Sequence, residues 1–107
     1  MKVQYYDNTG SDAEVSGQAL KTFELADGEK MQVKFLFWWD TLKREFSTID
    51  RGEITHKGVT LAYFFKSGNF MTWNLRESRD NARAFSEMVG DVFAELEKKI
   101  IKDQGRI

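Results

Sequence analysis

The spacing of apolar residues changes along this chain from every second residue to every third or fourth. In Lys30–Trp39 the apolar side chains first alternate with lysine and glutamine, as in a strand with one buried face. In Ser78–Lys102 they recur at the intervals of one helical stripe. That stripe consists of Phe85, Met88, Val89, Val92, Phe93, Leu96 and Ile100. The chain therefore combines strands with a long C-terminal helix, and Gly90 within the stripe predicts a close approach of that helix to the sheet.

The N-terminal part contains a short strand and a segment with two interpretations. Lys2–Tyr6 is expected to be a strand. Residues 12–25 favour a strand that ends at Leu25, because an Asp-Gly turn signal follows and a clear strand comes next. A capping-box spacing near the start of this segment makes a helix the alternative. If the loop to the next strand has three residues, Leu25 lies opposite Met31 and the apolar residues share one face.

Residues 40–50 also have two interpretations. Leu42, Phe46 and Ile49 follow a helical spacing, and Asp40 is a suitable N-cap residue. A short helix over 40–50 is therefore our first expectation. The alternative is a strand, because Phe46 and Ile49 also fit a stretch of extended chain.

Two segments near the middle of the chain are expected to form a hairpin. Val59–Phe65 and Phe70–Leu75 are rich in aromatic and β-branched residues, which favour strands. A three-residue turn at 67–69 would place Tyr63 and Phe65 in the core and Phe64 on the opposite face.

Together these elements predict one domain over residues 1–107. We expect an antiparallel meander sheet of about five to seven strands, packed against the C-terminal amphipathic helix. If residues 41–49 form a strand, the count approaches seven strands and a C-terminal helix. That order of elements resembles the pleckstrin-homology-type roll. The resemblance concerns element order alone and implies no function.

The composition excludes several kinds of chemical site. The chain has no Cys, so it has no disulfide, no thiol nucleophile and no thiolate metal site. Its one His, His56, lies in an expected turn beside Gly58. No nucleophile elbow and no phosphate-binding loop occurs. We therefore expect a chain that is not an enzyme and binds no cofactor or metal; an enzyme whose carboxylates converge from distant positions is an alternative.

The absence of cysteine and the apolar pattern of the chain also bear on the cellular compartment of the protein. A small secreted domain usually depends on disulfides, and the first residues, Met1–Asp7, lack the apolar core of a signal peptide. The longest wholly apolar run, 35–39, is far shorter than the roughly 20 residues that span a bilayer. We expect a cytoplasmic protein without a transmembrane segment.

The aromatic content points to a function. Nine Phe, three Trp and three Tyr are many for 107 residues, and one core face does not use all of the apolar side chains. Leu36, Trp38, Phe64 and Phe70 are left on the other face. Exposed apolar patches mark interfaces, so we expect a non-enzymatic protein-binding module, such as an inhibitor, adaptor or chaperone-like subunit. Its partner would be another protein or a second copy; the alternative is that a further element covers these side chains.

Basic residues support a second hypothesis. The net charge is −1, whereas residues 31–76 hold seven Lys or Arg against four acidic residues. A local anionic ligand, either nucleic acid or an anionic lipid, is therefore the alternative function. The candidate residues are Lys43, Arg44, Arg51, Arg76, Arg79 and Arg83.

Overall fold

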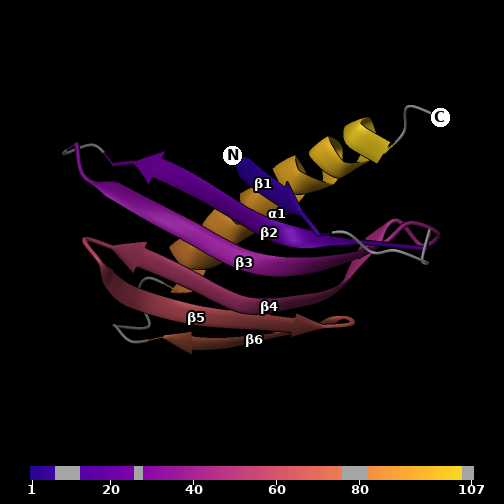
Figure 1. Cartoon of the computed structure of the whole chain (residues 1–107). Helices are drawn as coiled ribbons and strands as arrows, with labels where there is room; N and C mark the ends of the chain where they lie inside the picture. The colour runs from indigo at the N-terminus through magenta and orange to yellow at the C-terminus, as the bar shows by residue number, and fades with distance from the viewer. Residues whose placement is uncertain (7–12, 26–27, 76–81, 105–107) are drawn as a thin grey trace.

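A computed structural model describes residues 1–6, 13–25, 28–75 and 82–104. These residues form six strands and one helix: β1 (Lys2–Tyr5), β2 (Glu14–Glu24), β3 (Lys30–Asp40), β4 (Glu45–His56), β5 (Val59–Ser67), β6 (Phe70–Leu75) and α1 (Ala82–Gln104). The strands form one antiparallel sheet in the order β1-β2-β3-β4-β5-β6, so β1 and β6 are its edges. Figure 1 shows α1 crossing behind this sheet. The structure confirms an antiparallel meander followed by a C-terminal helix.

The core lies between the sheet and α1. Alternate residues of β3, from Met31 to Trp39, are buried. The rings of Phe35 and Phe93 meet edge to face with their centroids 5.2 Å apart, which joins β3 to the helix. The predicted helical stripe is confirmed, because its buried members are Phe85, Val89, Val92, Leu96 and Ile100.

The two faces of the sheet differ. We call the face that packs on α1 the helix face and the opposite one the open face. Side chains alternate between them along each strand, so Leu36 and Trp38 lie on the open face. Both are half-buried by their neighbours in the sheet.

Residues 12–25 are confirmed as a strand where the structure describes them. β2 pairs with β3 along its whole length, with Phe23 opposite Met31. The expected register placed Leu25 at that position, so the observed register differs from the predicted one by two residues. A shift by an even number keeps every side chain on its predicted face, because side chains alternate with a period of two.

The predicted helix over residues 40–50 is wrong. Asp40 does act as a cap, since its Oδ1 accepts the N–H groups of Leu42 at 2.9 Å and Lys43 at 3.0 Å. The turn ends at Arg44, whose φ is 55°, and the chain then continues as β4. The helical spacing from Phe46 to Ile49 comes from an irregularity of the β3–β4 register at this point, which keeps both side chains on the helix face. Leu42 is 84% exposed.

The predicted register of the β5–β6 hairpin is also wrong. Ser67 pairs with Phe70, so the loop has two residues, with Gly68 at a φ of 57°. This shift by one residue exchanges the faces of β5. Phe64 is 3% exposed and lies in the core, whereas Tyr63 and Phe65 are 41% and 43% exposed. The prediction had these three side chains reversed.

Two further expectations can be compared with the structure. The sheet has six strands, and in the described part of the chain β1 and β6 do not pair, so the seven-strand roll is not formed. The expected close approach of Gly90 to the sheet is wrong, because a β-carbon at that position would have no neighbour within 4 Å. The predicted helix start at Ser78 lies outside the described residues. Within those residues, no helix has the length and apolar composition needed to cross a bilayer.

Candidate interaction surface

The proposed aromatic contact residues do not all share one patch. Phe70 is 81% exposed, at the start of the edge strand β6. Strand pairing places it in one cross-strand row with Trp38, but Thr48 and Ser67 lie between them. Trp38 is therefore separated from Phe70 by two strands, and Phe64 is in the core. Of the four residues predicted for this contact, Phe70 is the most exposed.

Two aromatic residues that the sequence prediction missed lie near Phe70. Tyr63 and Phe65 of β5 are exposed on the open face and pair with Asn74 and Thr72 of β6. The signal for this placement is the Gly-Asn dipeptide between the strands, since glycine at the first loop position is typical of a two-residue hairpin. The open face of the β5–β6 hairpin thus carries three exposed aromatic side chains.

The other side of β6 is apolar as well. Met71, Trp73 and Leu75 point to the helix face and are half-buried, packed against the border of the core. The ring of Trp73 lies 5.3 Å from that of Phe64, measured between centroids. Because β6 is an edge strand, these side chains have a sheet neighbour on one side only.

Charged groups are nearly absent from this hairpin. Residues 59–75 contain one charged residue, Lys66, in a chain that is 31% charged. The Nζ of Lys66 donates to the backbone oxygens of Phe46, at 2.9 Å, and of Gly68. Its charge is therefore held toward the backbone near the β3–β4 end of the sheet, and β6 itself is uncharged.

The free backbone groups of β6 can be assigned from the pairing. Gly68 N–H donates to Ser47 O at 3.0 Å, so the N–H and C=O groups of Ser67 itself point away from β4 and toward β6. Ser67 and Phe70 close the hairpin, and the direction of these groups alternates along each strand. The N–H and C=O groups of Met71, Trp73 and Leu75 therefore point away from the sheet.

The opposite edge of the sheet is different. β1 has four residues, and one of them is charged, Lys2. The hydroxyl of Tyr5 donates to Asp103 of α1 at 2.7 Å, which ties the end of β1 to the helix. Short edge strands and lysine both disfavour pairing with another chain. β6 has six residues and neither of these protections.

The predicted anion-binding residues do not form one surface. Lys43 and Arg44 lie on the turn between β3 and β4, at the end of the sheet opposite the start of α1 (Figure 1). Arg83 lies in the first turn of α1 and pairs with Glu87, with Nε and Oε1 3.4 Å apart. Arg51 lies in β4 with a φ of 51°. Arg76 and Arg79 are outside the described residues.

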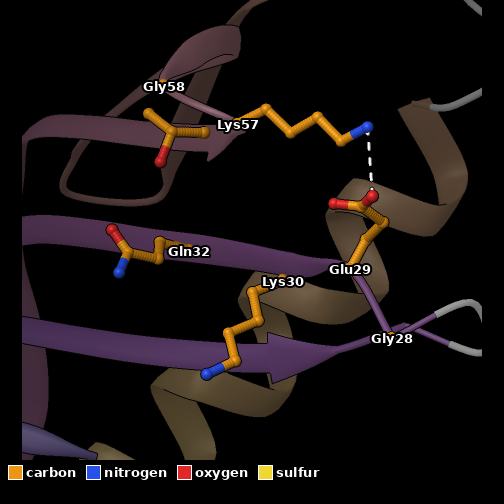
Figure 2. A pocket seen from close by; sticks show the side chains of 7 residues that line it. Gly28, Glu29, Lys30, Gln32, Lys57 and Gly58 are labelled. Atoms are coloured by element: carbon orange, nitrogen blue, oxygen red, sulfur yellow. Dashed lines mark ion pairs between the residues drawn. The ribbon is translucent and has the colours of Figure 1, made fainter.

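One hollow of about 450 Å³ lies at the tips of the β2–β3 and β4–β5 hairpins. Figure 2 shows Lys57 reaching Glu29, with Nζ and Oε1 3.0 Å apart, while the amino group of Lys30 lies well away from that pair. His56 Nε2 is 3.8 Å from the other oxygen of Glu29. The polar groups hold the two hairpins together and do not converge on a point within the hollow.

A second hollow, of about 220 Å³, opens on the open face beside Leu36. Its charged lining consists of Lys34, Arg51 and Glu53, which carry both signs. In the described part of the chain, no group of three or more His, Asp or Glu residues is arranged to hold a metal ion. Comparison of the chain with family models, curated proteins and solved structures finds no match.

Proposed function

We propose that this chain is a non-enzymatic protein-binding module that pairs an extended strand of its partner with β6. The observation that supports it is an uncharged, proline-free edge strand with apolar side chains on both faces. Such an edge is a template for pairing with another chain. Native sheets usually protect it with charge, proline or a covering element.

The backbone and the side chains of β6 would each contribute to binding of the partner strand. The outward N–H and C=O groups of Met71, Trp73 and Leu75 supply a hydrogen-bonding ladder, which recognises extended backbone of any sequence. Exposed aromatic residues beside the edge supply apolar contact area, and Phe70 is the most exposed of them. This combination favours an extended, mainly apolar segment of another polypeptide.

Among the described residues, no strand pairs with the outer side of β6. Figure 1 shows α1 leading away from β6 and toward β1, so the helix crosses the sheet and does not run along the β6 edge. The exposed Tyr63 and Phe65 extend the apolar surface across β5.

Binding of nucleic acid or anionic lipid has weaker support. The described members of the basic set lie at separate places, and Arg83 is already paired with an acidic side chain. Binding driven by phosphate contacts needs several basic groups on one surface and weakens steeply with salt. The proposed strand pairing depends on backbone and apolar contacts, so its affinity should change little between low and moderate salt.

Site-specific photo-crosslinking in the native host tests the proposal. Benzoyl-phenylalanine replaces Phe70 in one version of the chain and Tyr6, near the end of β1, in the other; both residues are exposed aromatics. We expect a discrete adduct from position 70 and none from position 6. A Thr72→Lys change should abolish the adduct, because a lysine on the edge opposes pairing. Thr22→Lys, at an exposed position of β2 far from β6 in the strand order, should leave it intact.

Two outcomes would overturn the proposal. One is the absence of any adduct from position 70. The other is an adduct that persists unchanged when Thr72 is replaced by lysine.

A further inference from the structure

β6 is suited to pair with its own copy. Antiparallel pairing about a two-fold axis brings each strand close to its identical copy, so a charge on the strand has the same charge of the copy nearby. β6 carries no charge, and the one charge of β5, on Lys66, is directed to backbone oxygens. The same pairing at the β1 edge would place the charged Lys2 of each copy near the other, because the strand has only four residues.

From this self-complementarity we infer that the strand taken up by β6 is β6 of a second copy, which joins two sheets into one. The inference rests on the proposed function and names its partner. A two-fold axis perpendicular to the sheet keeps both helices on the same side. Side chains of one face then lie opposite side chains of the same face.

The alternation of side chains restricts the register. Residues of the helix face must lie opposite residues of the helix face, so the two strands are centred on a residue and not between two residues. Centring on Trp73 places Met71 opposite Leu75 of the second copy and Trp73 opposite its counterpart. All three residues have outward N–H and C=O groups, and each such pair exchanges two hydrogen bonds.

The alternative centre, Thr72, uses the edge less completely. It places Met71 opposite Trp73 of the second copy and leaves Leu75 without a β6 residue opposite it. Fewer outward groups are then paired, and less of the apolar row on the helix face is covered. The register centred on Trp73 is therefore the one we propose.

The expected dimer is weak. Pairing of five residues from each strand, with a few aromatic side chains around it, buries less than the roughly 1,600 Å² of a standard interface. We expect a dissociation constant in the micromolar range and a monomer–dimer equilibrium that depends on protein concentration.

Sedimentation equilibrium of the full chain tests for this dimer. In the proposed register, Thr72 lies opposite Asn74 of the second copy on the open face. The double variant Thr72→Lys/Asn74→Lys should raise the dissociation constant by about tenfold or more, since like charges then face each other twice. Mixing it with Thr72→Glu/Asn74→Glu should restore the dimer. The control Thr22→Lys should leave the dissociation constant unchanged.

Disulfide trapping tests the register, because the chain contains no cysteine of its own. Thr72→Cys chains mixed with Asn74→Cys chains should form a mixed disulfide under mild oxidation. Directly opposed residues of a non-hydrogen-bonded pair have the short separation that a disulfide needs. Thr72→Cys chains alone should form little, and their ready crosslinking would overturn the register centred on Trp73.

The two experiments distinguish the loss of the dimer from the loss of partner binding. A chain that stays monomeric at all concentrations overturns the second copy as the partner. If the photo-crosslinker at position 70 then captures another protein in a manner sensitive to Thr72→Lys, the proposed function still stands. If neither the dimer nor that adduct forms, both are overturned.

Discussion

The ring of Phe64 lies against the backbone of Gly52 on the neighbouring strand, in the space that a β-carbon would occupy. Both residues are buried on the helix face. The pair forms next to a register shift in β4, where Arg51 adopts a φ of 51°. A glycine is therefore required at position 52 so that an aromatic ring from the next strand fits into the sheet.

Replacing Gly52 with alanine should destabilise the fold. The added methyl group meets both the ring and the backbone oxygen of Phe64, and overpacking of this kind costs about 1–3 kcal/mol. Urea denaturation of Gly52→Ala, Phe64→Ala and the double variant would measure the effect as a cycle. The cost of Gly52→Ala should shrink when position 64 is alanine. Part of the cost should remain, because the backbone oxygen at position 64 stays in place. Equal costs in both backgrounds would show that the ring of Phe64 does not contribute.

The misplacement of Phe64 shows which parts of the fold can be predicted from the sequence and which cannot. The alternating strand β3 and the stripe on α1 repeat over many residues, so one misplaced turn does not disturb them. The faces of β5 depend on whether one loop has two or three residues. Phe64 was therefore placed on the wrong face, and the exposed Tyr63 and Phe65 were missed from the candidate surface.

The secondary structure of residues 40–50 was mispredicted for a different reason. A cap residue such as Asp40 has the same local hydrogen bonds whether a helix or a single turn follows it. The irregularity in β4 then gave Phe46 and Ile49 a helical spacing within a strand. Pairing with β3 decides between these outcomes, and it depends on the whole β3–β4 hairpin and not on the spacing of apolar residues within 40–50.

Removing the Asp40 side chain should weaken the turn between β3 and β4. Its carboxylate accepts the N–H groups of Leu42 and Lys43, and loss of such a cap costs about 1 kcal/mol. Asp40→Ala should lower the free energy of unfolding by that amount, and Asp40→Asn, which keeps an acceptor, should lower it less. Thermal denaturation of the two variants would compare them. Equal losses would mean that the two hydrogen bonds add nothing to stability.

Replacing Gly90 with alanine should stabilise the protein. Gly90 lies within α1 on an exposed position, and a β-carbon there would have no neighbour within 4 Å. Glycine inside a helix is about 1 kcal/mol less favourable than alanine. The free energy of unfolding of Gly90→Ala should rise by up to this amount in urea denaturation. A loss of stability would show that the position is not open, contrary to the structure.

The hydroxyl of Tyr5 should make the fold sensitive to alkaline pH. Burial, the hydrogen bond to Asp103 and the negative charge of Asp103 raise the pKa of Tyr5 well above its usual value of 10.0. Above pH 10 the unfolded chain would release this proton while the folded chain retains it. The folded state then binds more protons, so its stability falls as the pH rises above 10 and is fully present below that value.

Tyr5→Phe separates this contribution from those of other groups that titrate in the same range. At pH 7 the variant should be less stable by about 1 kcal/mol, because it loses a hydrogen bond to a carboxylate. As the pH rises from 9 to 11, its stability should fall less than that of the natural chain, and Tyr63→Phe, at an exposed position, should follow the natural chain. Urea denaturation across this range would measure all three. Parallel pH curves for Tyr5→Phe and the natural chain would show that the Tyr5–Asp103 hydrogen bond does not hold the proton.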